Sequence, residues 1–169
     1  MSLPDTVSVK LVESSDTDEL TFIEKVLDSV PDLGVPLSEW ETQVLMSRLD
    51  CEPISTRLLW YKYFVARVDD TLTGMLSYID QGDNQIVFED LRVLEEYRGR
   101  NIVIPLVAEA LRHIEANQPT ENLDIIIDVD PRNIKVKRLY QMYGFRVEKI
   151  TVHQISLVSK FEDLKKRIL

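Results

Sequence analysis

The sequence is poor in the residues that cross-link chains or bind metals. Its only cysteine is Cys51, so no disulfide can form within the chain, and a reducing cytoplasm is the compartment that we expect. Its only histidines, His113 and His153, are far apart and have no cysteine beside them. Because these residues cannot by themselves build a zinc site, we expect no metal.

Long apolar runs and net positive charge are also missing. No run approaches the roughly 18–20 residues of a membrane span, and the N-terminus lacks the pattern of a secretory signal, so we expect no membrane partner. The formal net charge is −9, and residues 1–55 carry all of it, with twelve acidic and three basic residues. Without a net basic face, nucleic acid is not expected as a partner. The acidic third either keeps the surface solvated or attracts a cation.

The remaining pattern predicts one α+β domain over residues 1–169. Periodicity predicts strands at 7–12, 61–68, 73–79, 85–94, 123–129, 145–149 and 152–158, and helices at about 16–30, 38–50, 104–114 and 133–143, with a short basic tail from 161. Short turns at 69–71 and 80–84 predict an antiparallel meander. The helix between the strands 85–94 and 123–129 predicts a parallel pair at the centre of a mixed sheet. The mostly apolar strand 123–129 is expected to be buried on both faces.

Two of these helices begin where a strand ends and carry basic residues at their start. A helix N-terminus presents unpaired N–H groups and a partial positive charge, so each is a candidate anion site. Arg98 and Arg100 flank Gly99 before the first helix. The second helix has a basic cluster of Arg132, Lys135, Lys137 and Arg138. Together they could hold a phosphorylated cofactor, although for the second cluster a solvated helix end is an equally good interpretation.

At these residues the sequence resembles the GNAT superfamily of acetyl-CoA-dependent N-acetyltransferases. The matching motifs are Val93-x4-Arg98-Gly99-Arg100-Asn101 and, after the next strand, Asn133-x6-Tyr140-x3-Gly144-Phe145. The element order fits from Val7 to Val158, and the specific part runs from Glu89 to Phe145. The resemblance implies a mostly antiparallel sheet of about six to seven strands, with a central parallel pair and helices on both faces.

The resemblance also implies which residues bind acetyl-CoA. The backbone of the arginine-glycine turn would hold the pyrophosphate, which assigns Arg98, Gly99, Arg100, Asn101, Ile102 and Val103. Main-chain groups of the preceding strand would bind the pantetheine arm, which assigns Leu91, Arg92 and Val93, and a bulge in this strand would open a slot for the arm. Asn133 would bond the pantetheine region.

Two positions of the turn depart from the family pattern. Where the family has glycine, and then glycine or alanine, this sequence has Asn101 and Val103. Asn101 is tolerable, because asparagine reaches left-handed dihedral angles more easily than most residues. Val103 is expected to weaken cofactor binding, because its β-branched side chain could stand between the backbone N–H groups and the pyrophosphate.

The implied reaction is attack of a neutral amine on the thioester carbonyl, which requires a base, an acid and stabilisation of an oxyanion. Tyr140 is the candidate acid for the leaving thiolate, and an aromatic side chain that only packs on a helix face is the alternative. Glu89 is the candidate general base, directly or through water, and Asp90 would orient or bind the substrate. Side chains alternate along a strand, so only one of Glu89 and Asp90 is expected on the catalytic face.

The acceptor is expected to bind among residues 16–52, where acidic residues are abundant. Asp28, Asp32, Glu39 and Glu41 favour a cationic acceptor, such as a polyamine, an aminoglycoside-like amine or a peptide amine. Trp40, Trp60 and Tyr61 are expected in the core, with pocket lining as the alternative. The sequence thus predicts acetyl transfer from acetyl-CoA, or from a longer acyl-CoA, to a primary amine. A catalytically impaired GNAT-fold binding or regulatory module is the alternative function, and a homodimer through the C-terminal strands is compatible with both.

Overall fold

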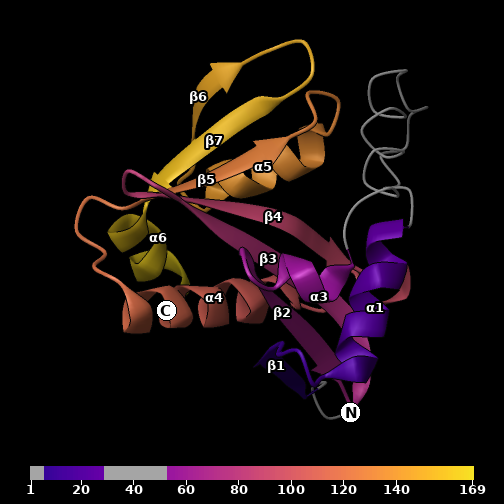
Figure 1. The fold of residues 1–169 in the computed structure, drawn as a ribbon. Coiled ribbons are helices and arrows are strands. Elements are labelled where there is room, and N and C mark those ends of the chain that lie inside the picture. Colours follow the sequence, from indigo (N-terminus) through magenta and orange to yellow (C-terminus); the bar gives the residue numbers. More distant parts are fainter. Residues whose placement is uncertain (1–5, 29–52) are drawn as a thin grey trace.

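The structure of the protein is a computed structural model that describes residues 6–28 and 53–169 (Figure 1). The predicted helix at 38–50 lies outside the described residues, together with Asp32, Glu39, Trp40, Glu41 and Cys51.

A seven-stranded sheet with the order β1-β2-β3-β4-β5-β7-β6 forms the centre of the molecule. Its strands are β1 (Val7–Leu11), β2 (Tyr61–Val68), β3 (Thr71–Gly82), β4 (Gln85–Val93), β5 (Asp124–Val129), β6 (Arg146–Ile150) and β7 (Ile155–Lys160). Only β4 and β5 pair in parallel, and every other neighbouring pair is antiparallel. The predicted α+β fold with its central parallel pair is confirmed.

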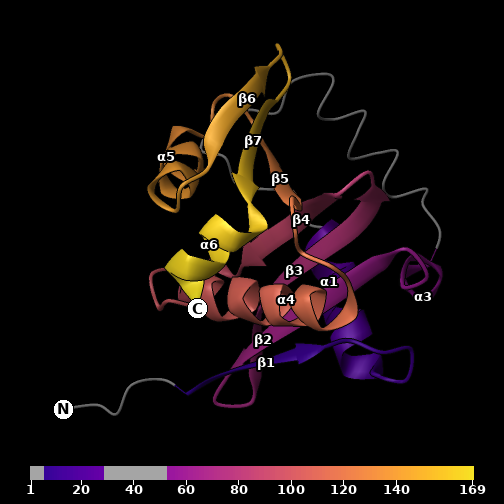
Figure 2. The same ribbon diagram turned by 90° about the vertical axis from the view of Figure 1, so that its left-hand side faces the viewer.

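Helices pack on both faces of this sheet, as predicted. The described helices are α1 (Thr17–Asp28), α3 (Ile54–Arg57), the 3₁₀ turn η1 (Glu95–Tyr97), α4 (Val103–Asn117), α5 (Ile134–Met142) and α6 (Phe161–Ile168). On one face, Ile23 of α1 and Ile54 of α3 share a core with Tyr63. The other face carries the larger core, in which residues of α4, α5 and α6 pack together (Figure 2). The two faces are called the α1–α3 face and the α4–α6 face below.

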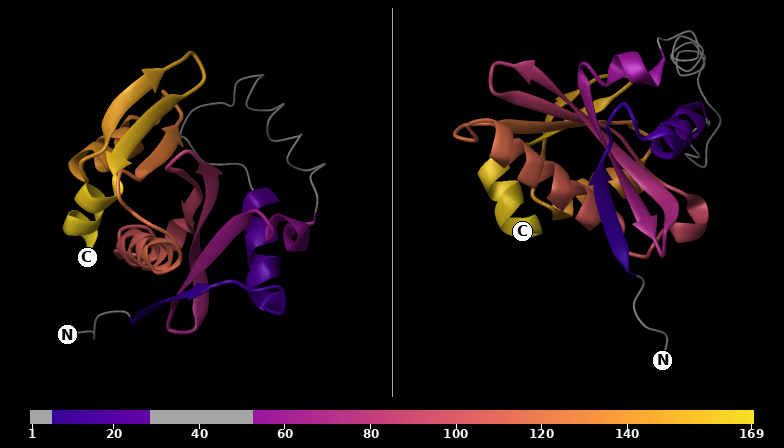
Figure 3. Two further views of the ribbon diagram at one scale, coloured as in Figure 1. Left: turned by 60° about the vertical axis from the view of Figure 1, so that its left-hand side comes forward. Right: turned by 60° about the horizontal axis from the view of Figure 1, so that its bottom comes forward.

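The parallel pair separates part of the way along its length. Only residues Gln85–Phe88 of β4 pair with β5, and their partners are Asp124–Ile127. Beyond these pairs β4 continues to Val93 and β5 to Val129. Figures 1 and 3 show the two strands leaving a common point and diverging. On its other side β4 contains a β-bulge, because Ser77 pairs with Glu89 but Met75 pairs with Arg92. The bulge that the resemblance implies is therefore confirmed, and it bends β4 away from β5.

The extreme C-terminus differs from the prediction. Instead of a basic tail, residues 161–168 form α6, whose Phe161 and Leu164 are buried. The helix starts directly after β7, so no turn signal separates the two elements. Its acidic residues lie in the first turn and its basic residues in the last, where each favours the helix dipole.

β5 is central but is not buried on both faces. Ile125, Ile127 and Val129 are buried on the α4–α6 face. On the opposite face Ile126 is only half-buried and Asp128 is exposed. The prediction was wrong because no described helix covers this face of β5, so an apolar run in the sequence did not mean burial on both sides.

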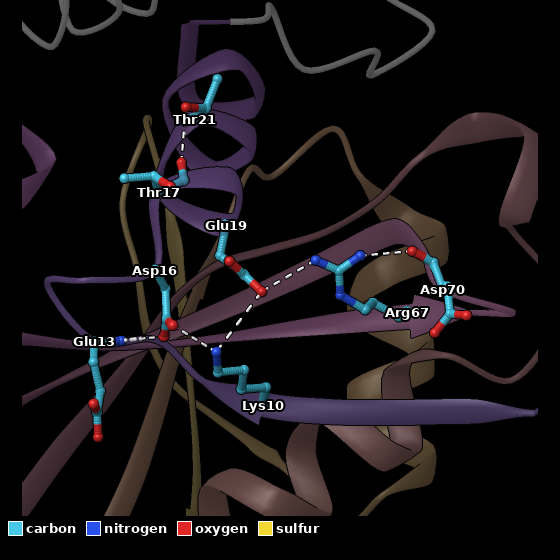
Figure 4. A network of polar contacts seen from close by, with 8 residues as sticks. All are labelled: Lys10, Glu13, Asp16, Thr17, Glu19, Thr21, Arg67 and Asp70. Carbon is cyan, nitrogen blue, oxygen red and sulfur yellow. Dashed lines mark hydrogen bonds and ion pairs between the residues drawn. The ribbon is translucent and has the colours of Figure 1, made fainter.

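Ion pairs fix α1 to the first two strands (Figure 4). Lys10 Nζ lies 2.6 Å from Asp16 Oδ1, and Arg67 Nη2 donates to Glu19 Oε1 at 3.1 Å. Arg67 also donates to the Asp70 carbonyl oxygen at 2.6 Å. This network orients α1, and with it the wall of the α1–α3 face.

Candidate functional site

The turn before α4 has the backbone that an anion-binding loop needs. Gly99 and Asn101 have φ angles of 79° and 56°, so the prediction that Asn101 tolerates the left-handed region is confirmed. Residues 98–101 are exposed, and a Cβ atom added to Gly99 would meet nothing within 4 Å. The guanidinium of Arg100 lies 5.1 Å from the centre of the Tyr97 ring, and Arg98 Nε donates to the Val93 carbonyl oxygen at 3.3 Å. The turn is thus open to a ligand and has two arginines beside it.

The N-terminus of α4 follows this turn without a side-chain cap. Ile102 is the N-cap residue, it is buried, and the first turn of the helix contains no acidic residue. Val103 is half-buried and lines a small apolar cavity together with Phe88 and Tyr140. Its side chain therefore lies against the core on the α4–α6 face.

The start of α5 is organised by its own residues. The Asn133 side chain caps the helix by accepting a hydrogen bond from the Val136 N–H at 3.3 Å. Arg132 forms a two-point contact with Asp130, with Nη2–Oδ2 and Nε–Oδ1 distances of 2.8 and 3.0 Å. Lys135 and Arg138 are exposed. For Arg132, the Asp130 contact favours the interpretation as part of a helix end rather than of an anion site.

Tyr140 is held inside the molecule on α5. Its side chain packs edge-on against Phe145, with ring centres 5.6 Å apart, and it lines the apolar cavity beside Ile127. Burial raises the pKa of the Tyr140 hydroxyl well above its ordinary value. The hydroxyl therefore keeps its proton at neutral pH, as an exposed tyrosine also does, and the raised pKa makes it a weaker proton donor. Packing in the core, the alternative role, is compatible with the same position.

Glu89 belongs to a row of side chains that crosses three strands. Tyr63 of β2 pairs with Ser77 of β3, and Ser77 pairs with Glu89 of β4. Directly opposed residues in an antiparallel pair point to the same face, so these side chains lie side by side on the α1–α3 face.

Asp90 joins the same row, which corrects the prediction that only one of the two acids would face it. Ser77 Oγ donates to Asp90 Oδ2 at 3.2 Å, so the Asp90 side chain lies on the face that Glu89 shares with Ser77. The reason is the bulge, in which Asp90 has a φ angle of 49° and interrupts the alternation of the strand.

Arg57 completes this group, and sequence reasoning missed it. Its guanidinium lies 4.8 Å from the centre of the Tyr61 ring and 5.9 Å from that of Tyr63. Arg57 Nη2 is 4.0 Å from Asp90 Oδ2, and the two side chains are 20% and 3% exposed. Together these residues are called the polar cluster: Arg57, Tyr61, Tyr63, Ser77, Glu89 and Asp90.

The polar cluster has an unsatisfied member. The Tyr63 hydroxyl is buried and has no hydrogen-bond partner among the described residues. Burial raises its pKa far above the ordinary value, so the group stays protonated. A buried hydroxyl without a partner costs about 1–3 kcal/mol, which a bound ligand or water can recover. A polar serine within an apolar strand was the available sequence signal. Tyr63 reaches it only through the strand register, and Arg57 belongs to α3.

The predicted arm-binding residues lie on the diverging part of β4. Leu91, Arg92 and Val93 are half-buried, and the Arg92 side chain donates to the Val26 carbonyl oxygen at 2.9 Å. That contact ties β4 to the end of α1. Contact of their main-chain groups with a cofactor stays a prediction.

The predicted acceptor wall is only partly described. Asp28 is exposed at the end of α1 and is the one member of the four predicted acids within the described residues. Tyr61 is half-buried in the polar cluster, whereas Trp60 is 68% exposed, so the prediction that Trp60 packs in the core was wrong. It lies in the turn between α3 and β2, where its ring has no element above it in the described part of the chain.

Residues 6–28 and 53–169 contain no candidate metal site and no candidate membrane-spanning helix. No group of three or more His, Cys, Asp or Glu side chains there is arranged to hold a metal ion. No described helix is both long enough and apolar enough to cross a membrane.

Comparisons with solved structures show a shared fold. The PaiA N-acetyltransferase of Thermoplasma acidophilum, in complex with coenzyme A, matches with a TM-score of 0.74 and 16% identity, over 92% of this chain and 99% of that chain. The spermidine N-acetyltransferase of Vibrio cholerae, in complex with CoA and spermine, matches with a TM-score of 0.62 and 17% identity, over 94% and 97%. The IAA acetyltransferase of Bacillus cereus matches with a TM-score of 0.61 and 14% identity, over 92% and 99%.

The sequence itself carries a family signature. No curated protein sequence matches the chain. The model of the acetyltransferase (GNAT) family, however, matches residues 35–145, a region that contains the turn before α4, the polar cluster and Tyr140. This chain belongs to the GNAT acetyltransferase family.

Proposed function

We propose that this protein transfers an acetyl group from acetyl-CoA to the primary amine of a small cationic acceptor. The observation that supports this best is the separation of β4 from β5. The separation lies between the open turn that leads into α4 and the polar cluster on the α1–α3 face. A donor held at the turn and an acceptor held at the cluster would meet there.

The residues around the turn fit a phosphorylated donor. Two left-handed residues, Gly99 and Asn101, orient successive backbone N–H groups, and the N-terminus of α4 adds its partial positive charge. In this proposal residues 98–103 hold the pyrophosphate, the main chain of residues 91–93 holds the amide arm, and Asn133 lies beside it. Since Val103 packs against the core, its side chain lies away from the exposed turn. Bound acetyl-CoA supplies an activated thioester carbonyl.

The chain supplies a base and an acid on opposite faces of the sheet. Glu89 lies on the α1–α3 face and would take the proton of the acceptor ammonium, while Asp90, held by Ser77, would orient the amine. Tyr140 lies on the α4–α6 face and would donate its proton to the departing thiolate. The thioester would have to reach both groups where β4 separates from β5.

The charge of the acceptor follows from the cluster. Two carboxylates, Glu89 and Asp90, outnumber the single positive charge of Arg57 in the cluster, so the cluster keeps a net negative charge that attracts one ammonium group. A structural neighbour, the Vibrio cholerae enzyme, is a spermidine N-acetyltransferase, so the fold is compatible with such acceptors.

Thermal unfolding with and without acetyl-CoA tests the first half of the proposal. A ligand at roughly a hundred times its dissociation constant adds about 2.7 kcal/mol to the free energy of unfolding. We therefore expect the midpoint to rise by several degrees at about millimolar acetyl-CoA. Acetyl phosphate, which lacks the adenosine diphosphate and the arm, is the control. No rise would show that the turn binds no cofactor and would overturn the proposal.

Release of free thiol from acetyl-CoA in the presence of amines tests the second half. We expect release that depends on both the amine and the enzyme. Binding of acetyl-CoA without release for any amine would instead support the impaired binding or regulatory module.

A further inference from the structure

Arg57 places a permanent positive charge inside the polar cluster. A guanidinium remains protonated at all physiological pH values. Arg57 is only 20% exposed on its side chain and lies within 4.0 Å of Asp90, whose side chain is 3% exposed. The buried carboxylate of Asp90 is therefore balanced from within the protein.

The place that Arg57 occupies is one that would suit a ligand cation. Aromatic faces and carboxylates are the groups that bind an ammonium most readily. The guanidinium covers the rings of Tyr61 and Tyr63 and approaches Asp90, so these groups already have a cation. A second ammonium on the acceptor would meet Arg57 there. In this half-buried setting like charges repel more strongly than in water.

The remaining polar groups next to Arg57 fit an oxygen atom better than an ammonium. The Tyr63 hydroxyl is buried without a hydrogen-bond partner among the described residues and keeps its proton, so it can donate. A guanidinium has donors only. A hydroxyl and a guanidinium side by side match a carbonyl or carboxylate oxygen, whereas an ammonium has only donors to offer.

We infer that Arg57 selects acceptors by charge: the substrate has one reactive amine, and the part of the molecule near that amine is neutral or anionic, without a second positive charge. This inference rests on the proposed acetyl transfer to an amine. It departs from a polycationic acceptor, because it confines the acceptor to molecules whose reactive ammonium is their only positive charge and so excludes diamines and polyamines.

Three amines with the same four-carbon spacing test the inference on the unchanged protein. Butylamine, 1,4-diaminobutane and 4-aminobutanoate present a neutral, a positive and a negative far end. We expect kcat/KM for butylamine and for 4-aminobutanoate to exceed that for 1,4-diaminobutane by about tenfold or more, at one pH and ionic strength. A preference for 1,4-diaminobutane would overturn the inference. Absence of thiol release with all three would instead count against the proposed function.

Variants of Arg57 assign the selection to this residue. The compared quantity is kcat/KM for 1,4-diaminobutane divided by kcat/KM for butylamine. Arg57→Gln should raise this ratio by about tenfold, and Arg57→Lys should leave it at the wild-type value. The ratio is measured within each variant, so lower stability of Arg57→Gln does not change it. Arg67→Gln is the matched control, since Arg67 also pairs with a carboxylate, Glu19, but outside the polar cluster (Figure 4). Equal ratios in Arg57→Gln and Arg67→Gln would contradict the assignment.

Discussion

Single residues decide the chemistry of this molecule where they break the regularity of a strand or a turn. Asp90 adopts a left-handed backbone inside β4, and both Glu89 and Asp90 consequently serve the same face. A regular strand would have sent one of them to the opposite core. Asn101 likewise breaks the regularity of the turn before α4, because it adopts a left-handed φ of 56° at a position where the family has glycine.

Tyr140→Phe tests the proposed acid at this scale. Because the hydroxyl is the only group removed, we expect the turnover number to fall by about a hundredfold while the affinity for acetyl-CoA stays the same. Steady-state kinetics with the thiol assay and thermal shifts with acetyl-CoA measure the two quantities. Tyr143→Phe, at the C-cap of the same helix and beside the same cavity, is the control and should keep full turnover. Unchanged turnover in Tyr140→Phe would leave this tyrosine with a packing role.

The residues of the site were predictable from the sequence where local geometry governs them. The left-handed conformations of Asn101 and Gly144, whose φ is 92°, follow from residue type and neighbours. Tyr63 was not predictable, because it meets Glu89 only through the pairing of β2, β3 and β4. Arg57 was not predictable either, because it lies on α3 and approaches Asp90 only where that helix packs on the sheet. The bulge at Asp90 was expected from the resemblance alone, and alternation predicted the wrong face for one of the two acids.

At the scale of elements, α6 holds the C-terminal half together. Phe161 N–H donates to the Leu123 carbonyl oxygen at 2.9 Å, and Lys165 pairs with Glu115 of α4. Arg167 lies against Gly144, where a Cβ atom would come within 2.7 Å of its Nε atom. The end of α5 and the end of α6 are thus in direct contact.

Gly144→Ala tests this contact. Both a left-handed alanine and the approach of Arg167 oppose the substitution, so we expect a loss of about 1–2 kcal/mol in the free energy of unfolding, measured by urea denaturation. Gly82→Ala is the matched control, because Gly82 has a similar φ of 76° and no atom within 4 Å of the added Cβ. The excess loss in Gly144→Ala should disappear when Arg167→Ala is added. Equal losses of unfolding free energy in Gly144→Ala and Gly82→Ala would mean that the Arg167 side chain moves aside without destabilising the protein.

Helices and strands differ in how far the sequence predicts them. β2 was predicted at its observed bounds, 61–68, because turn residues and a change of periodicity mark both its ends. α6 was missed because its first residue continues the strand before it, and eight residues give too short a period to recognise.

For the whole molecule, stability should depend on pH in two separate windows. Burial lowers the pKa of His113 below its ordinary 6.5, with a further contribution from Lys62. His113 therefore favours the folded state above pH 6.5, and this contribution is lost as the pH falls through its lowered pKa. The hydrogen bond from Arg67 lowers the pKa of Glu19 below 4.5, so its contribution is present above that pH and is lost on further acidification.

Unfolding midpoints measured from pH 8 to pH 3 would resolve the two windows. His113→Gln should reduce the pH dependence of the midpoint only in the upper window, where His113 titrates. Glu19→Gln should reduce it only in the lower window, where Glu19 titrates. Tyr78, whose hydroxyl lies 2.8 Å from His113 Nδ1 and whose pKa burial raises to about 12, does not titrate in this range. A profile of His113→Gln that parallels the wild type above pH 5 would contradict the assignment.

The early end of the β4–β5 ladder also determines what entry of a ligand requires. Ladder bonds between these strands stop at Phe88 and Ile127, so a narrow chain can slide in beyond them without breaking any β4–β5 bond. An amide arm lying along β4 would pair with its main chain as a short added strand does. In the proposed function, an acetyl-CoA arm would occupy the place beside β4 that β5 leaves after Phe88.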